Sequence, residues 1–318
     1  HIPHRLNRDH VLIPGGKAFA GSVMKAVRQK ILQAARSSST VLIEGETGTG
    51  KELIAHAIHA MSPRSAERFV RVSCAGIPAQ RMEAEFFGEK GNSHDSPSKD
   101  GQPGRFALAN HGSLFIDEVN LLSSTIQPKL LRVLQEQALD APDSGSSTPI
   151  DVRLMAASAL PLEQLVQAGQ FRADLFYRLD VIRIVAPPLR EHLEDLPELT
   201  EELVARLNRQ LGLSVEGVTE EVIHMFQDYS WPGNIRELEN VLENAVALSE
   251  SELIYAEHIH LEGTAPAPLT LKERLKREER QILRQTLAQC GGSRVKAMEL
   301  LGLSKTVFYG KLKEYQLD

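Results

Sequence analysis

Short apolar runs alternate with amphipathic stretches over the first 185 residues of the chain. Runs rich in Val, Ile, Leu and Phe predict strands at 41–43, 69–72, 113–116, 152–157 and 181–185. Between them, apolar residues at helical spacing predict helices at 22–35, 53–58, 79–87, 127–137 and 171–179. Strands that alternate with helices in this way predict an α/β fold with a parallel sheet and helices on both of its faces.

The pattern changes after Pro187 and Pro188, where the strands stop and helical spacing continues to about residue 259. This change predicts a separate subdomain that is all helical. A segment of alternating proline and alanine at 263–268 then predicts a short, stiff linker.

The end of the chain is predicted to form a helix-turn-helix. A long helix is expected at 271–289, a second helix begins at the cap Ser293, and a turn at 302–304 leads into a third. The side chains of the second helix that are predicted to face inward are Val295, Ala297, Met298 and Leu301.

Three segments lack any lasting periodicity. Residues 88–104 and 140–149 are polar and rich in turn formers, which predicts exposed, mobile loops. Residues 1–16 are interpreted as an arm or the remains of a linker, and the start at His1 without an initiator Met is compatible with removal of a piece from the front.

Composition indicates a soluble globular protein, with 42% hydrophobic and 25% charged residues. The two cysteines, Cys74 and Cys290, have no metal-ligand spacing around them, and no signal peptide precedes them, so a reducing cytoplasm is expected. No apolar run approaches the roughly 20 residues that span a bilayer, so no membrane partner is expected. Residues 271–318 carry 11 Lys and Arg against 6 Asp and Glu although the whole chain has a net charge of −6, which makes this end the candidate nucleic-acid surface.

A glycine-rich octet between the strand at 41–43 and the following helix carries the first chemical signal. Its spacing, G-x4-G-K, lets backbone N–H groups turn inward around phosphate oxygens, with the lysine as a point charge and the helix N-terminus behind it. A nucleoside triphosphate is therefore the expected ligand, and the residues that bind it are Gly45, Glu46, Thr47, Gly48, Thr49, Gly50, Lys51 and Glu52. Glu52 replaces the usual Ser or Thr ligand of Mg²⁺, so other groups and the phosphates themselves must hold the ion.

Asp117 and Glu118 end the apolar strand at 113–116. Downstream of a phosphate loop, such a pair suits ATP hydrolysis. One carboxylate would hold Mg²⁺ through a water molecule, and the other would polarise the water that attacks the phosphate. A cationic residue that reaches the γ-phosphate is also expected, because the protein's task in phosphoryl transfer is to position groups and stabilise charge.

Six segments make residues 41–247 resemble the AAA+ domain of bacterial enhancer-binding proteins, the NtrC-like activators of sigma-54 RNA polymerase. They are GETGTGKE at 45–52, GSLFIDEVN at 112–120, PKLLRVLQE at 128–136, GQFRADLFYRLDVIRI at 169–184, APPLREHLEDLP at 186–197 and WPGNIRELENVLENAV at 231–246. The last 48 residues resemble the Fis-type DNA-binding domain of the same family.

The resemblance implies an AAA+ P-loop NTPase with a parallel sheet, a helical lid and an all-α helix-turn-helix domain. The expected boundaries are an arm at 1–16, the α/β nucleotide-binding subdomain at 17–188, the lid at 189–262, a linker at 263–270 and the DNA-binding domain at 271–318.

Roles follow from the resemblance position by position. Lys51 contacts the phosphates of ATP, Asp117 serves Mg²⁺, Glu118 serves the hydrolytic water and Ser158 stands at the first sensor. Arg236 falls at the position of the lid sensor arginine.

Arg172 and Arg178 stand at the family's arginine-finger positions, which reach a neighbour's nucleotide from across a ring. Activity that depends on a residue supplied in trans requires assembly, and a hexameric ring is the family expectation.

Two departures from the family concern the coupling of ATP to sigma-54. The family's loop sequence Gly-Ala-Phe-Thr-Gly-Ala, which touches sigma-54, is replaced after Gly91 by residues 92–96, Asn-Ser-His-Asp-Ser. Ser73 stands where the family has an Asn that switches the catalytic glutamate.

The predicted DNA contacts are Ser304, Lys305, Thr306, Tyr309, Lys311 and Lys313, which lie on or at the start of the recognition helix. Lysines in such positions mostly hold phosphates rather than read bases. Fis-type domains pair, so a palindromic double-stranded site bound by a dimer is expected.

Three functions stay open on the sequence. The favoured hypothesis is an ATP-binding, DNA-binding transcriptional regulator that interacts with RNA polymerase holoenzyme but makes no productive contact with sigma-54. The second is a working sigma-54 activator ATPase with a divergent loop, and the third is an AAA+ remodeller unrelated to transcription.

Overall fold

The computed structural model describes residues 21–88, 103–140, 147–249, 252–261, 279, 282–283, 286–287, 290 and 293–315. The chain divides into two compact units, His1–Ile259 and His260–Asp318. Several expectations fall outside the described residues: the arm at 1–16, most of the loop at 88–104, the middle of the loop at 140–149, the linker and most of the helix at 271–289.

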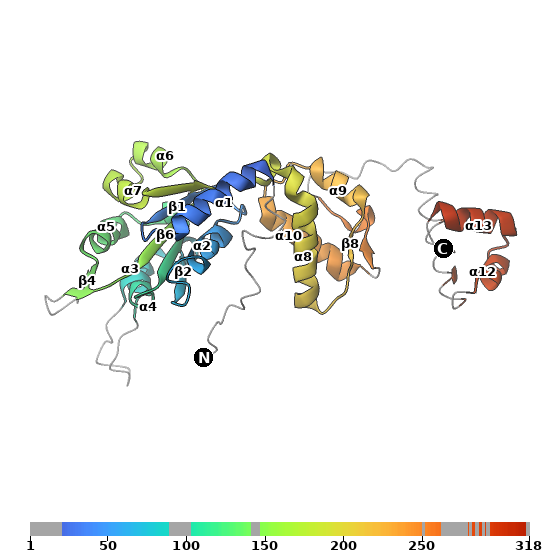
Figure 1. Ribbon diagram of the computed structural model, residues 1–318, viewed down its shortest axis with the longest axis horizontal. Coiled ribbons are helices and arrows are strands. Elements are labelled where there is room, and N and C mark those ends of the chain that lie inside the picture. The colour runs from blue at the N-terminus through green and yellow to red at the C-terminus, as the bar shows by residue number, and fades with distance from the viewer. Residues whose placement is uncertain are drawn as a thin grey trace, which may run out of the picture. The chain divides into compact units, whose positions relative to one another are not determined.

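The first unit is built on a five-stranded sheet with the order β2-β3-β6-β1-β7 (Figure 1). All four pairings are parallel, which confirms the predicted fold class. The strands are β1 (Val41–Glu44), β2 (Phe69–Ser73), β3 (Ser113–Asp117), β6 (Arg153–Ser158) and β7 (Ile182–Val185). The carboxyl ends of parallel strands lie at one edge, so the segments after β1, β3 and β6 meet there.

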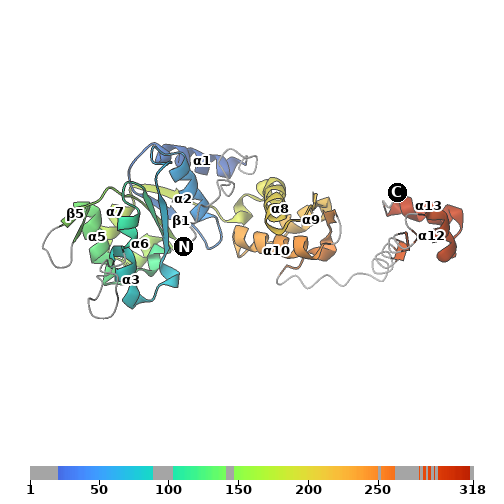
Figure 2. The ribbon, with the colours of Figure 1, turned by 90° about the horizontal axis from the view of Figure 1, so that it is seen from below.

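Alternate side chains of the strands enter two separate cores, one on each face of the sheet. Val41, Ile43 and Phe115 pack with α1 (Ser22–Ala35) and α2 (Lys51–Ala60). Leu42, Leu114 and Ile116 pack on the other face, and all six of these side chains are fully buried. The helices of this second face are α3 (Ala79–Phe87), α4 (Arg105–Leu108), α5 (Ile126–Glu136), α6 (Leu162–Gln167) and α7 (Ala173–Leu179), most of which are labelled in Figure 2.

One expected loop has ordered ends that the sequence did not indicate. β4 (Ala138–Asp140) and β5 (Ser147–Pro149) form an antiparallel ladder at the two ends of the segment 140–149. The three residues of β5 are exposed, so the segment has no apolar alternation that could have predicted a strand.

The second part of the first unit is a helical lid. Its helices are α8 (Leu196–Leu211), α9 (Glu220–Gln227) and α10 (Asn234–Leu248). Trp231 is fully buried among them and donates its indole N–H to the Phe226 carbonyl at 2.7 Å. The expectation of an all-helical subdomain is wrong in one respect, because β8 (Gly217–Val218) pairs in parallel with β9 (Leu253–Ile254). Two-residue strands are too short to leave a pattern in the sequence.

The second unit places α12 (Arg294–Leu300) and α13 (Lys305–Glu314) around a small core of Leu283, Ala297, Phe308 and Leu312. Ser293 is the N-cap of α12 as predicted, and Met298 and Leu301 pack against the core. Val295 is 61% exposed, so its predicted inward orientation is wrong. Val295 and Ala297 are two residues apart and therefore point to opposite sides of the helix.

No helix within the described ranges is long and apolar enough to cross a membrane.

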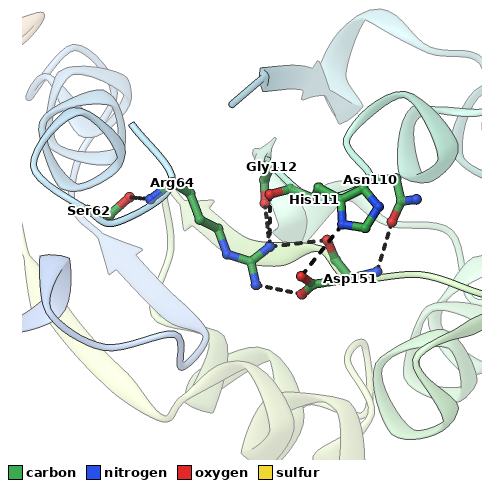
Figure 3. A network of polar contacts seen from close by, with 6 residues as sticks. All are labelled: Ser62, Arg64, Asn110, His111, Gly112 and Asp151. Atoms are coloured by element: carbon green, nitrogen blue, oxygen red, sulfur yellow. Dashed lines mark hydrogen bonds and ion pairs between the residues drawn. The ribbon is translucent and has the colours of Figure 1, made fainter. Parts of the chain in front are cut away.

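A polar clamp closes the amino-terminal edge of the sheet, opposite the edge where β1 and β3 end (Figure 3). The Arg64 guanidinium, just beyond α2, donates to the carbonyls of His111 and Asp151 at 3.1 Å and of Gly112 at 3.3 Å. The same guanidinium pairs with the Asp151 carboxylate at 2.5 Å. The Asn110 side chain accepts the Asp151 backbone N–H at 2.9 Å. One side chain thus joins the segments that lead into β3 and β6.

Replacement of Arg64 by Ala is expected to lower the free energy of unfolding of the first unit by about 1–2 kcal/mol, because three carbonyls lose a charged donor. Urea denaturation followed by circular dichroism measures this change. The control is Arg81→Ala, which removes an exposed arginine of α3 and should change stability by less than about 0.5 kcal/mol. Equal stability of the two variants would contradict the role of the clamp.

Candidate nucleotide site

The phosphate loop connects the end of β1 to the start of α2. Gly48 and Gly50 have φ angles of 84° and 82°, a conformation that favours glycine. Lys51 begins α2, is only 8% exposed and donates from Nζ to the carbonyls of Gly45 at 2.6 Å and Glu46 at 2.7 Å. Burial lowers the pKa of Lys51, and the nearby Asp117 and Glu118 oppose that shift. The lysine is therefore held inside the loop, with two carboxylates close enough to act on its charge.

Asp117 ends β3, and Glu118 follows it with a φ of 54°. A positive φ at a residue other than glycine is strained and recurs at functional sites. The Glu118 backbone N–H is bonded to the Asp117 Oδ1 atom at 3.1 Å, which orients that carboxylate. The register pairs Asp117 with Ser73 of β2. The structure thus brings together the two acids and the lysine that the sequence predicted.

The oxygen ligands at this edge suit magnesium. Mg²⁺ prefers a few carboxylates together with phosphate oxygens and water, and Asp117 is a partly exposed carboxylate at the end of a strand. Within the described ranges, no group of three or more His, Cys, Asp or Glu side chains is arranged to hold a metal ion by itself. Asp117 therefore fits an ion whose other ligands are phosphate oxygens and water, which stays a prediction.

Ser158, at the first-sensor position, is fully buried at the end of β6. Its carbonyl accepts the Gly45 backbone N–H at 3.2 Å, which joins β6 to the phosphate loop. Its hydroxyl donates to the Leu160 carbonyl and lies 3.2 Å from the Asn120 Oδ1 atom. Sequence reasoning missed Asn120, although it stands two residues after Glu118 in the segment GSLFIDEVN.

The lid binds the phosphate loop directly. The Asn234 side chain donates to the Thr47 carbonyl at 3.0 Å and to the Glu46 carboxylate at 3.2 Å. The Arg236 backbone N–H lies 3.3 Å from the Gly48 carbonyl, while its side chain is exposed on α10. The phosphate loop and the first turn of α10 are therefore joined by direct hydrogen bonds.

Arg190, just before the lid helices, makes a two-point ion pair with Glu46 at 2.6 and 2.8 Å. This bond, with help from Asn234, lowers the pKa of Glu46 to about 2. The carboxylate is therefore charged at any physiological pH. Sequence reasoning missed Arg190 and Asn234, although both lie in segments that carry the family resemblance.

A largely apolar pocket lies between α1, α2, the phosphate loop and the lid. Its lining includes Met24, Ile31, Leu53, Pro187, His192 and Ile235. Burial lowers the pKa of His192 and so favours its neutral imidazole. The Asp195 carboxylate, 3.4 Å away, acts against this shift because it favours the protonated ring. The pocket is next to the phosphate loop and is lined mostly by apolar side chains, as small-molecule pockets commonly are. It was missed because its residues come from four separate elements.

The two predicted finger arginines are both exposed; Arg172 is the N-cap residue of α7 and Arg178 lies within that helix. Arg172 pairs with Asp174 at 2.7 Å, and Arg178 donates to the Leu134 carbonyl of α5 at 2.9 Å. These partners belong to α5 and α7 rather than to the phosphate loop. Within one chain both arginines therefore bond to neighbours on α5 and α7, and not to Lys51 or the two acids.

In the second unit, the predicted DNA contacts lie on α13 or just before it. Ser304, Lys305, Thr306 and Tyr309 are exposed. Lys311 is instead half-buried and paired with Glu279 at 2.6 Å, and the side chain of Lys313 lies outside the described residues. The exposed residues thus cluster at the start of the helix, where a recognition helix contacts DNA.

Together these features define a P-loop nucleotide-binding protein of the AAA+ class that also carries a helix-turn-helix. Residues 18–185 match the family described as Sigma-54 interaction domain. Residues 190–273 match the AAA+ ATPase lid domain, and residues 274–315 match the bacterial regulatory protein Fis family. The chain belongs to the family of sigma-54-dependent enhancer-binding transcriptional regulators.

Curated relatives agree with this assignment. The Nif-specific regulatory protein of Azotobacter vinelandii is 40% identical over 88% of this chain and 55% of its own length. The formate hydrogenlyase transcriptional activator FhlA of Escherichia coli (strain K12) is 39% identical over 93% of this chain and 43% of its own. The response regulator protein PilR of Pseudomonas aeruginosa is 40% identical over 93% of this chain and 68% of its own. The chain spans about half the length of the first two relatives.

Solved structures of NtrX from Brucella abortus are also similar. One has a TM-score of 0.69 at 32% identity and covers 93% of this chain and 68% of that one. A second, in complex with ATP, has a TM-score of 0.68 at 33% identity and covers 94% of this chain and 68% of that one.

Gly48 offers a test of the contact between loop and lid. A Cβ atom at this position would overlap the Gly233 carbonyl oxygen, and the left-handed backbone adds about 1–2 kcal/mol of strain. We expect Gly48→Ala to lower the melting temperature and to weaken binding of a fluorescent ATP analogue. Gly76→Ala is the control, because an added Cβ there meets nothing within 4 Å. A Gly48 variant that matches the control in both measurements would contradict the contact.

Proposed function

We propose that the protein is a DNA-bound transcriptional regulator whose shape is set by ATP bound at the phosphate loop. The observation that carries this proposal is the direct bonding of the loop to the lid, by Asn234 to Glu46 and Thr47 and by Arg236 to Gly48. We infer that a nucleotide bound in the loop shifts the lid through these bonds, because they join the loop directly to the first turn of α10. A nucleotide bound at this edge of the sheet then moves the lid.

The site residues receive separate roles. Lys51 and the loop amides bind the phosphates, and the pocket lined by Leu53 and Ile235 takes the base. Asp117 would hold Mg²⁺ through water, and Glu118 orients the attacking water. Bound magnesium would neutralise charge on the phosphates. The similar NtrX structure in complex with ATP supports nucleotide binding by this chain.

The finger assignment places Arg172 and Arg178 at the nucleotide of a neighbouring chain. Their exposure at the start of α7 and within it supports an action in trans, because both are accessible to another copy. Hydrolysis then requires assembly, and a hexameric ring is the arrangement we propose. Ser158 contributes as a first sensor through Asn120, and Arg236 as the lid sensor.

The second unit supplies the DNA contact. We assign residues 17–188 and 189–262 to the nucleotide-binding subdomain and its lid, and residues 271–318 to DNA binding by a dimer at a palindromic site. Ser304, Lys305, Thr306 and Tyr309 are exposed for this purpose. Lys311 has a competing partner in Glu279 and must leave it to reach a phosphate.

The same proposal includes regulation without productive sigma-54 contact. It rests on the polar sequence at 92–96, which offers neither the aromatic nor the threonine of the family loop. A second candidate is a working sigma-54 activator, favoured by the match of residues 18–185 to the Sigma-54 interaction domain. A remodeller unrelated to transcription is disfavoured by the match of residues 274–315 to the Fis family.

Transcription in vitro separates the candidates. We expect the protein to bind its own promoter and to change transcription by another holoenzyme in an ATP-dependent manner, without open-complex formation by the sigma-54 holoenzyme. The measurement compares both holoenzymes with ATP and with a non-hydrolysable analogue. ATP-dependent open complexes with sigma-54 would establish the second candidate instead.

The finger assignment has its own test. Arg172→Ala and Arg178→Ala should keep the affinity for a fluorescent ATP analogue but lower ATP turnover by about 10³-fold or more, because the charge that they supply acts in the transition state. Lys51→Ala should lose nucleotide binding itself. Turnover by an arginine variant that equals that of the parent would refute the assignment.

A further inference from the structure

Arg71 forms an ion-pair bridge between two carboxylates at the nucleotide site. Its Nη1 atom lies 2.8 Å from the Glu52 Oε2 atom, and its Nη2 atom lies 3.3 Å from the Asp117 Oδ2 atom. Arg71 comes from β2, Glu52 from the first turn of α2 and Asp117 from the end of β3. The bridge therefore joins three elements at the edge of the sheet where the phosphate loop lies.

Both carboxylates of this bridge stand at positions where Mg²⁺ is expected to bind. Glu52 directly follows Lys51, at the place where phosphate loops usually carry a hydroxyl ligand for Mg²⁺. Asp117 is the carboxylate assigned to the same ion. The guanidinium thus bonds both side chains that a divalent cation near the β- and γ-phosphates would approach, and it contributes a positive charge there.

We propose that Arg71 is an internal counter-cation that Mg²⁺ must displace from Asp117 when it binds with nucleotide. Arg71 and Glu52 then set how much magnesium the protein requires. This inference rests on the proposed nucleotide-binding function.

The energies of the bonds allow the exchange. The Arg71 and Glu52 side chains are 44% and 42% exposed, and ion pairs with this much solvent contact contribute little to stability. The Asp117 contact is also long for a charged hydrogen bond. A divalent ion that brings its own phosphate ligands can therefore replace the guanidinium, while Arg71 stays paired with Glu52.

The bridge also explains which residue of β2 contacts the acidic pair. The family's switch position is Ser73, whereas the contact with Asp117 is made by Arg71, two residues earlier on the same face of the strand. A charged side chain here responds to the arrival of a cation, because repulsion moves it away from Asp117.

Charge counting predicts opposite effects for two substitutions. Glu52, Arg71 and Asp117 together carry one negative charge, which becomes two in Arg71→Gln and none in Glu52→Gln. We expect Arg71→Gln to lower the Mg²⁺ concentration at half-maximal binding of a fluorescent ADP analogue by about fivefold, and Glu52→Gln to raise it by a similar factor. The double variant should return close to the parent.

Two measurements extend the test beyond nucleotide fluorescence. Electron paramagnetic resonance of Mn²⁺ in the presence of ADP should give the same order of metal affinities. The control is Arg105→Gln, which removes an arginine that pairs with Glu85, and it should leave the metal midpoint unchanged. Circular dichroism and melting temperatures show which variants are folded, and the Glu52 variant keeps the inference testable if the Arg71 variant does not fold.

The outcomes separate this inference from the proposed function. Failure of the parent to bind the ADP analogue at saturating Mg²⁺ would overturn the function. Normal binding by the parent, with equal Mg²⁺ midpoints for the Arg71, Glu52 and Arg105 variants, would overturn only the role of Arg71. Weaker ADP binding by Arg71→Gln in EDTA and at saturating Mg²⁺ alike would overturn it too, since Arg71 would then contact phosphate.

Discussion

The close packing of the lid against the phosphate loop is the constraint on which the rest of the nucleotide site depends. Gly48 leaves no room for a side chain beneath the Gly233 carbonyl, and its own carbonyl faces the Arg236 backbone N–H. Backbone groups have no rotamers with which to adjust, so a change in the loop must be accommodated by the lid. The same packing encloses the apolar pocket, whose walls come from both sides of the contact.

Charge is distributed around that contact in pairs. Glu46 is held in its ionised form by Arg190 on the lid side, and Lys51 is buried between loop carbonyls close to Asp117 and Glu118. Arg71 completes the arrangement by bonding Asp117 and Glu52. Glu46, Glu52 and Asp117 thus each have an arginine partner within the chain. Phosphates and a metal ion would therefore compete with these partners for charged side chains that are already paired.

Much of the fold could be predicted because its elements have strong periodic patterns. The helices α1 and α3 begin and end where the apolar spacing indicated, and the strands β1 and β3 are short runs that are buried on both faces. The errors share a physical reason. The ladder of β4 with β5 and the pair of β8 with β9 are held by backbone bonds between exposed or very short segments, which leave no hydrophobic pattern. Val295 was misplaced because it lies two residues from Ala297, on the opposite side of a helix of only seven residues.

The sequence by itself determined the chemical groups of the site and their order along the chain. Glycines, Lys51 and the pair Asp117 and Glu118 follow a spacing that only a strand, a loop and a helix can use. Only the tertiary structure decided which distant residues meet them. Arg71, Asn120, Arg190 and Asn234 reach the site through the parallel order of the strands and the docking of the lid. These contacts depend on how separate elements pack in the tertiary structure, and the spacing of residues along the sequence does not indicate that packing.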